Sequence, residues 1–418
     1  MAANGAAFTA INTAVTTTSA SYVDVTGAVI TEAQLDAAGI AVGQKALVYI
    51  TTQVGISAGG ALINIKARHG TADFSESISQ FSATAADFKS VVGFLTVWTR
   101  VSGETLTLQW NRSAGTATIN FISMFVLNLS DDLTEGTHWW FAERVTDDPL
   151  TTSFLDGAAL SLVPIAGHDV AVFSYNLLSH VSLAASAITR IGSTGTVTES
   201  VPRGRQEAGG AATQISTMML QRVFPNLAAS TQTFTEQCAL SAGTTGTRLH
   251  SAMFALDLDK FRNQAFAWTE ATISLSATPY ATALQTLSLT PGVVSDVWCG
   301  SCWSFDLQNA AREAQFRLQL DNVDAPAGQT TAAYNFEQAG DATDEPSFPL
   351  TTLVVAMSAA AHTFDLDGSA DATAGTPLGQ HRSLFAMTLE LAAAAAPARP
   401  SFQIRPTRPR PFAPGLAR

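Results

Sequence analysis

Apolar and polar residues alternate with a period of two over short runs of this chain, and Gly, Ser, Asn and Asp separate the runs. A period of two is typical of β-strands that bury one face. The clearest alternating run is residues 105–110 (TLTLQW), whereas residues 46–50 (ALVYI) are a continuous apolar run and residues 170–175 (VAVFSY) are apolar except for one serine. Helical periodicity is confined to residues 31–39, which predict one or two turns with a glycine stop. The pattern predicts an all-β protein.

The same short strand occurs three times along the chain. Its copies are residues 124–129 (MFVLNL), 253–258 (MFALDL) and 384–389 (LFAMTL), and their central phenylalanines are 129 and then 131 residues apart. So regular a period indicates one domain used three times in tandem. We therefore expect repeats over residues 1–132, 133–262 and 263–391, followed by a tail over residues 392–418.

Each repeat contains about eight short strands separated by turn residues, which is typical of a β-sandwich. A jelly roll is our first expectation and an immunoglobulin-like sandwich the second. The order of the strands resembles that of the tumour-necrosis-factor-like jelly rolls. A first strand precedes a central apolar strand such as residues 46–50, and the alternating run at 105–110 precedes a closing strand centred on Phe125. The predicted fold is three tandem jelly-roll-like domains with an extended tail.

Charge and composition exclude several functional classes. Hydrophobic residues make up 46% of the chain and charged residues only 13%, well below the usual quarter. The net charge is −12, and an acidic body argues against nucleic-acid binding. The amino-terminal residues show no signal peptide, and the apolar runs are far shorter than the ~20 residues of a membrane helix. We expect no membrane insertion and synthesis in a cytoplasm.

The last 27 residues differ from the rest, because they contain five arginines, frequent proline and no acidic residue. Proline blocks helices and central strands and favours extended polyproline geometry. Arginine supplies charge and forked hydrogen bonds, and two phenylalanines supply apolar anchors. The tail is either a free linker or an anchor on a partner protein, and the phenylalanines favour the anchor. Its candidate contact residues are Arg399, Phe402, Arg405, Arg408, Arg410 and Phe412.

Three short motifs suggest chemistry but fit structural roles better. Residues 55–59 match G-x-S-x-G, yet a strand rather than a helix follows, so we expect Ser57 in a hairpin. Cys299 and Cys302 have C-x-x-C spacing inside an apolar run, which predicts two structural cysteines. Residues 365–371 resemble part of a calcium loop but lack its distal glutamate, which favours a strand end and turn. We expect no catalytic set.

Histidines and tryptophans complete the search for candidate sites. The seven histidines show no metal spacing, so neither a metal nor a cofactor is expected. Trp139 and Trp140 lie at the junction of the first two repeats. If they are exposed, they could stack on a sugar ring. If they are buried, they would seal the interface between two sandwiches. A second aromatic junction, at Phe266 and Trp268, favours the seal.

This organisation resembles that of tailed-bacteriophage virion structural proteins of the fibre, spike or capsid-decorating type. It combines tandem all-β repeats, an acidic and weakly charged body, and a Pro/Arg tail. The resemblance implies a non-enzymatic component of a virion, assembled in the host cytoplasm and attached to other virion proteins through its tail. The resemblance to jelly rolls of the tumour-necrosis-factor type, which commonly associate in threes, implies either a homo-oligomer or a pseudo-trimer of the three repeats. The alternative is a carbohydrate-binding adhesin that recognises a host surface glycan.

Overall fold

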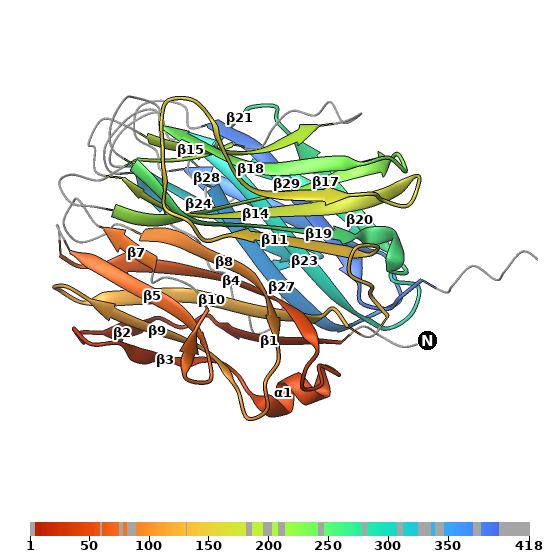
Figure 1. Cartoon of the computed structure of the whole chain (residues 1–418), viewed down its shortest axis with the longest axis horizontal. Coiled ribbons are helices and arrows are strands. Elements are labelled where there is room, and N and C mark those ends of the chain that lie inside the picture. Colours follow the sequence, from red (N-terminus) through yellow and green to blue (C-terminus); the bar gives the residue numbers. More distant parts are fainter. Residues whose placement is uncertain are drawn as a thin grey trace, which may run out of the picture.

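The structure is a computed structural model, and most of its described residues lie in β-strands. It describes residues 5–58, 61–74, 78–81, 89–130, 132–180, 186–194, 203–207, 214–240, 246–277, 282–306, 312–324, 336–338, 347–370 and 378–392. The strands form three consecutive sets along the chain, and each set makes two antiparallel sheets (Figure 1). We call the sheet that faces the other two sets the inner sheet and its companion the outer sheet.

The first set has the inner sheet β1-β10-β4-β8, with β2 beside β10, and the outer sheet β3-β9-β5-β6, with β7 beside β5. The helix α1 lies between β3 and β4. The bounds are β1 Ala6–Ile11, β2 Val15–Thr17, β3 Val23–Ile30, α1 Glu32–Ala37, β4 Lys45–Ile56, β5 Leu62–His69, β6 Ala72–Asp73, β7 Ile78–Phe81, β8 Lys89–Thr99, β9 Leu106–Arg112 and β10 Ala117–Asn128.

The second set repeats this arrangement with the inner sheet β11-β19-β14-β17, beside which β12 pairs with β19, and the outer sheet β13-β18-β15-β16. The short 3-10 helix η1 follows it. The bounds are β11 Trp139–Arg144, β12 Asp148–Pro149, β13 Leu155–Leu162, β14 His168–His180, β15 Ser186–Thr194, β16 Arg203–Glu207, β17 Gln214–Leu227, β18 Gln232–Leu240, β19 Gly246–Asp257 and η1 Leu258–Lys260.

The third set has the inner sheet β20-β29-β23-β27, with β21 beside β29, and the outer sheet β22-β28-β24-β25, with β26 beside β24. The bounds are β20 Gln264–Thr269, β21 Ile273–Ser274, β22 Thr282–Leu289, β23 Ser295–Asp306, β24 Arg312–Leu320, β25 Val323–Asp324, β26 Phe336–Gln338, β27 Ser347–Met357, β28 His362–Ala370 and β29 Leu378–Thr388.

All three sets share the connectivity of an eight-stranded jelly roll. Among the eight main strands of a set, the inner sheet has the order first, eighth, third and sixth, and the outer sheet has the order second, seventh, fourth and fifth. Two sheets joined alternately in this way make two Greek keys, as in a jelly roll, and not the strand order of an immunoglobulin sandwich. The prediction of an all-β protein built from β-sandwiches is confirmed.

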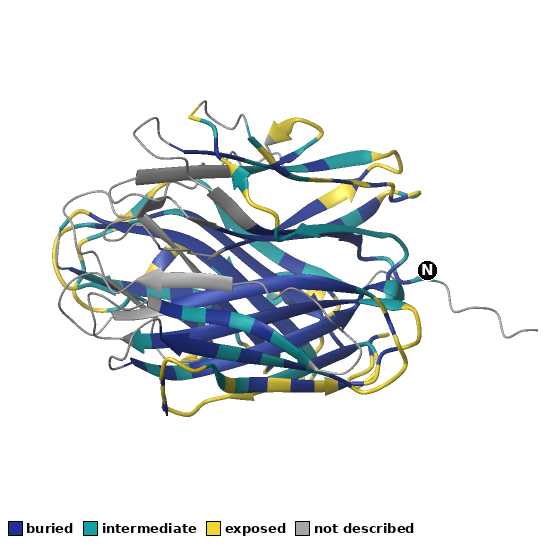
Figure 2. Ribbon diagram, turned by 90° about the horizontal axis from the view of Figure 1, so that it is seen from above, coloured by how far each residue is buried: buried dark blue, intermediate teal, exposed yellow. Residues whose placement is uncertain are grey.

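The inner sheets of the three sets pack against one another around a shared aromatic core. Tyr49 on β4, Phe173 on β14 and Trp298 on β23 come from equivalent third strands, and all three are buried. The Trp298 ring stacks on Phe173 with centroids 5.7 Å apart, and Tyr49 meets Phe173 edge-on at 5.9 Å. One hydrophobic cluster therefore joins all three sets, so that each inner sheet is buried on both faces (Figure 2).

The contacts between sets follow a ring. The sixth strand of each set packs on the inner sheet of the next set: β8 on β14 and β19, β17 on β23 and β29, and β27 on β4 and β10. Hydrogen bonds cross each interface, as from the Ser123 hydroxyl to the Thr351 carbonyl (2.6 Å) and from the Gly93 amide to the Thr217 hydroxyl (3.2 Å). Head-to-tail contacts of this kind close when the rotation is right. In this structure, three units of one chain complete the ring.

Two local expectations can be compared with the structure. The predicted helical turns at 31–39 appear as α1, whose capping box joins Thr31 and Gln34. The expected hairpin around Ser57 is wrong, because β4 belongs to the inner sheet and β5 to the outer sheet. A jelly roll alternates between its two sheets, so this connection crosses the sandwich instead of pairing its flanking strands.

Candidate attachment face

Both ends of the described chain lie at the same end of the molecule. In each set the last strand finishes beside the segment that leads into the first strand, as in the hydrogen bond from the Asn128 amide to the Gly5 carbonyl (3.0 Å). The Ala392 amide donates to the Lys260 carbonyl at 2.8 Å, which holds the start of the tail at this end. The tail therefore leaves the body next to the point where the chain enters it.

Two loops from each set form the surface around these chain ends. The loop between the second and third main strands bonds the loop after the sixth strand through a glycine amide: Gly43 to the Arg100 carbonyl, Gly167 to Leu227 and Gly292 to Ala359. These glycines have φ values of 86°, 80° and 75°, a left-handed conformation that residues with a Cβ adopt at a cost. We call these six loops, with the strand ends that adjoin them and the links 129–130, 132–138 and 258–263, the terminal face.

Exposed aliphatic side chains gather on the terminal face. Six of the nine large hydrophobic residues that are exposed in the described part of the chain belong to it, two from each set, and they are between 42% and 67% exposed. A repeated apolar surface of this kind is typical of an interaction site. The six residues are Val42, Val101, Val163, Ile165, Val294 and Val355.

The terminal face also carries carboxylates. Asp36 pairs with the buried Arg100 (2.6 Å) and is itself mostly exposed, and Asp132 is exposed as well. Asp259 accepts a hydrogen bond from the Asp169 amide at 2.6 Å. Burial, and then the neighbouring Asp259 charge, raise the pKa of Asp169. The terminal face thus offers negative charge beside aliphatic surface.

One group on this face has the composition of a metal site. Ligand atoms of His168, Asp257 and Asp259 lie within 4.8 Å of one another. The sequence did not reveal the group, because His168 is far from the aspartates along the chain. Its atoms already have hydrogen-bond partners. His168 Nδ1 bonds Asp257 at 2.8 Å, and Asp259 accepts from the Gln264 amide group at 2.8 Å. These hydrogen bonds explain the group without a metal.

The tail residues predicted from the sequence lie outside the described residues. They are Arg399, Phe402, Arg405, Arg408, Arg410 and Phe412. The structure gives the place from which the tail leaves, which is the terminal face.

The two junction tryptophans are buried and point into different cores. The Trp139 ring belongs to the core shared by the three sets, and its indole nitrogen donates to the Leu129 carbonyl of the preceding link at 3.0 Å. Trp140 packs inside the second sandwich. In this arrangement neither ring presents a face on which a sugar could stack, and Trp139 lies between the first two sets.

The residues of the three motifs that suggested chemistry are buried or hydrogen-bonded within the fold. Cys299 and Cys302 are buried, and burial raises the pKa of the Cys302 thiol to about 12, so both sulfurs are held as neutral thiols. The Ser57 hydroxyl accepts a hydrogen bond from the Thr116 amide (2.9 Å) within its connection. Asp365 lies on β28 and accepts from the Thr286 hydroxyl at 2.6 Å; position 371 is outside the described residues.

The second sandwich contains a buried ionic network that was not expected from the sequence. Arg248 bonds Asp148 at 2.6 Å and Glu236 at 3.1 Å, and the side chains of Arg248 and Glu236 are fully buried. Glu236 and Arg248 lie on strands with period-two burial, where each replaces an apolar core residue. The signal was present in the sequence as two charged residues on inward positions of predicted strands.

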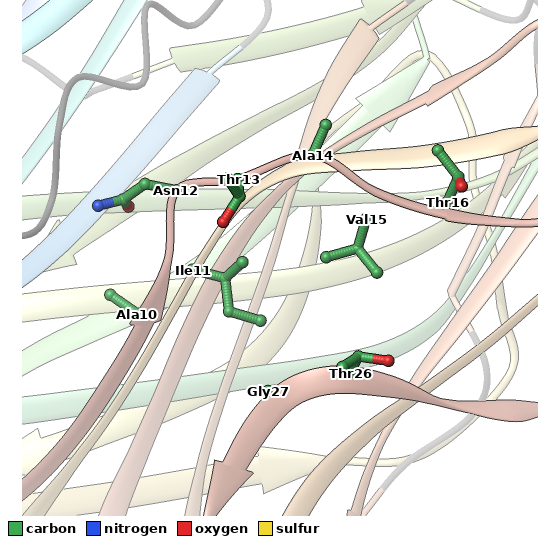
Figure 3. Close-up of a pocket in the computed structure, with 9 residues that line it drawn as sticks. All are labelled: Ala10, Ile11, Asn12, Thr13, Ala14, Val15, Thr16, Thr26 and Gly27. Atoms are coloured by element: carbon green, nitrogen blue, oxygen red, sulfur yellow. The ribbon is translucent and has the colours of Figure 1, made fainter.

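An open hollow of about 730 Å³ lies at one edge of the first sandwich, between β1, β2 and β3 (Figure 3). Small and hydroxyl-bearing residues line it, and none of them has an ionisable side chain. Its lining side chains therefore include no general acid or base of the usual kinds. The lining residues are Ala10, Ile11, Asn12, Thr13, Ala14, Val15, Thr16, Thr26 and Gly27.

Comparison with known proteins gives no family. No protein-family model and no curated protein matches the chain. Among solved structures, PNGF-II shares 6% identity over 85% of this chain and 100% of its own, with a TM-score of 0.30. A triple jelly-roll turret protein of an archaeal virus shares 10% identity over 82% of this chain and 79% of its own, with a TM-score of 0.17.

Recombinant peptide N-glycanase F is also similar, with 10% identity over 59% of this chain, 95% of its own and a TM-score of 0.27. Because all three TM-scores are below 0.5, these likenesses carry no argument about fold or function. Among the described residues, no helix is long and apolar enough to cross a membrane.

Proposed function

We propose that this chain is a non-enzymatic structural protein of a tailed-phage virion, in the role of fibre, spike or capsid decoration. It is assembled in the host cytoplasm, and its tail attaches it to other virion proteins. The observation that carries the proposal is the terminal face, where both ends of a closed three-sandwich body meet and from which the tail leaves. A body attached at this end would direct its opposite end away from the particle.

The ring of sandwiches suits this role because the three sets share one core within a single chain. Each inner sheet is covered on both faces, so the described part of the chain buries its apolar surface by itself. A structural protein displayed on a particle needs such a body and an attachment segment, and the sequence supplies both.

An adhesin that binds glycans through aromatic stacking is less well supported. Six of the seven tryptophans are buried, among them Trp110 and Trp303. The seventh, Trp268, is half-buried and is covered by the Arg222 guanidinium, 3.4 Å from the ring centre. A sugar would have to displace that cation before it could stack on this ring.

The test compares the full chain with a chain that ends at Ala392, which keeps the Ala392–Lys260 hydrogen bond. Both are immobilised and exposed to a lysate of the infected source, and the retained proteins are identified by mass spectrometry. Capsid or tail proteins that are retained by the full chain alone support the proposal. If both chains retain the same virion proteins, the sandwiches bind them and the tail is a linker. If neither chain retains one, the proposal is wrong.

A further inference from the structure

We propose that, in the free protein, residues 393–418 fold back and dock on the terminal face of the same chain. This goes beyond the proposed function, because it concerns the tail before any particle is met. Three observations support it: the charge of the face, its exposed aliphatic side chains, and the place where the tail begins.

Charge favours contact between the tail and this face. Acidic side chains that reach the surface of the terminal face outnumber the basic ones there, whereas residues 393–418 contain five arginines and no acidic residue. Arginine forms forked, charge-assisted hydrogen bonds with carboxylates. The acidic residues include Asp36, Asp132, Glu135, Asp169, Asp259 and Asp296, against Lys45, Lys260 and Arg262.

The apolar residues of the tail match the other property of the face. Phe402 and Phe412 are separated by a segment rich in proline and arginine, and this spacing sets two apolar anchors about 31 Å apart in polyproline geometry. The aliphatic pairs on the face, such as Val42 with Val101, are repeated by each set around the ring. Docking would cover part of this surface and place arginines beside carboxylates of the same face.

The tether makes such docking easy to reach. The tail starts at Ala392, which is bonded to the terminal face itself. A 26-residue segment in polyproline geometry spans about 80 Å, whereas a body of this chain length has a radius of gyration near 22 Å. Because the two partners are tethered, their effective concentration reaches about the millimolar range. Even weak contacts would then keep much of the tail docked.

A second copy of the body is a poorer occupant. Two terminal faces brought together would set carboxylates against carboxylates, and like charges at a contact disfavour association. The tail carries the opposite charge and so removes this conflict.

The test uses a dye on the tail of the full chain. Ala413→Cys provides one reactive thiol, because the native residues Cys238, Cys299 and Cys302 are buried. Quenching of the dye by acrylamide, a neutral quencher, is compared with quenching of a labelled peptide of residues 393–418. A docked fraction of about two thirds lowers the quenching constant about threefold. In 1 M salt, where the screening length is about 3 Å, the constant should rise toward the peptide value.

Substitutions on the face identify the docking surface. Ile165→Ser combined with Val294→Ser should raise quenching toward the peptide value, and so should Arg405, Arg408 and Arg410 changed to Gln. Val23→Ser combined with Val145→Ser is the matched control, since these valines are exposed but lie outside the terminal face. The control should leave quenching unchanged.

Three results would overturn the inference. The first is equal quenching of the dye on the full chain and on the free peptide. The second is protection that the face substitutions leave intact. The third is protection that grows with protein concentration, because it would place the tail on another copy. These measurements use the purified protein without particles, so their failure leaves the capture experiment with virion proteins as a separate test.

Discussion

At the scale of single residues, one buried arginine, Arg248, bonds two carboxylates whose pKa values are shifted in opposite directions. Asp148 also bonds Arg144 near the surface, and these hydrogen bonds lower its pKa to about 2. Glu236 is fully buried, and its burial outweighs the attraction of Arg248, which raises its pKa to about 7. Both acids bond the same guanidinium, so the burial of each carboxyl decides the direction in which its pKa shifts.

The raised pKa of Glu236 predicts that ionisation of this group lowers the stability of the folded chain as the pH rises. In the unfolded chain the Glu236 carboxyl has its ordinary pKa of 4.5, and in the folded chain its pKa is about 7. The contribution of Glu236 is therefore fully present below pH 4.5 and is lost as the pH rises to 7. Relative to wild type, Glu236→Gln should gain stability over this range, up to about 3 kcal/mol. Denaturant unfolding at pH 4.5 and pH 7.5 measures the difference.

Asp148→Asn is the matched control, because the pKa of Asp148 is shifted in the opposite direction. The stability from Asp148 is present above its unfolded pKa of 3.8 and is lost as the pH falls toward 2. This variant should therefore lose stability relative to wild type most clearly at neutral pH. Equal effects of pH on Glu236→Gln and wild type would contradict the assignment.

At the scale of elements, the positions of strands could be predicted and their partners less well. The run 170–175 falls on β14 and the run 105–110 on β9, because period-two burial and strand length are local properties. The connection at Ser57 was misjudged, because glycine-rich turns look alike whether the next strand pairs with the last or crosses to another sheet. That choice depends on the global strand order.

The repeated glycines of the terminal face were also missed. Gly43, Gly167 and Gly292 precede the third main strand of each set, yet their surrounding residues differ. What they share is a left-handed φ and a hydrogen bond to the loop after the sixth strand, which appear only in three dimensions. The exposed valines were missed for a similar reason, since a lone apolar residue in a loop is ordinary until its equivalents are seen together.

These glycines allow a prediction about the loops. A Cβ at Gly43 or Gly167 would meet nothing within 4 Å, so strain in the left-handed conformation is the main cost of substitution. Gly43→Ala and Gly167→Ala should each destabilise by about 1–2 kcal/mol. Asparagine tolerates this conformation better, so Gly167→Asn should cost less than Gly167→Ala. Thermal unfolding measures all three, and an alanine variant as stable as wild type would contradict the strain argument.

At the scale of the whole molecule, the chain closes its own ring of three sandwiches. The sequence showed the repeat but left open whether three units of one chain or three chains would associate. How the units associate depends on the side chains of the inner sheets that point away from their own sandwich, toward the other two. In the third set a tryptophan and a glycine, Trp298 and Gly300, stand where the first set has Leu47 and Tyr49. A Cβ on Gly300 would lie 2.5 Å from the Phe385 ring, so this glycine admits the aromatic core.

The shared core predicts that the three sandwiches unfold together. Calorimetry should show one transition with matching calorimetric and van't Hoff enthalpies. Trp298→Ala should lower the stability of the whole body by about 3–5 kcal/mol, because its ring contacts Tyr49, Phe125, Phe173 and Phe385. Phe234→Ala, whose ring meets the Phe224 ring within the second sandwich, is the comparison. Separate transitions of the wild-type sandwiches would contradict a shared core.

The central claim is that this chain is a built-in part of a virion, and the composition of purified particles tests it most directly. Particles from the source are purified through two density gradients, washed in high salt and analysed by quantitative mass spectrometry. We predict that the chain is present in a fixed ratio to the major capsid protein through both gradients. A chain that stays in the soluble fraction, or whose ratio to capsid falls with each gradient, would contradict the claim.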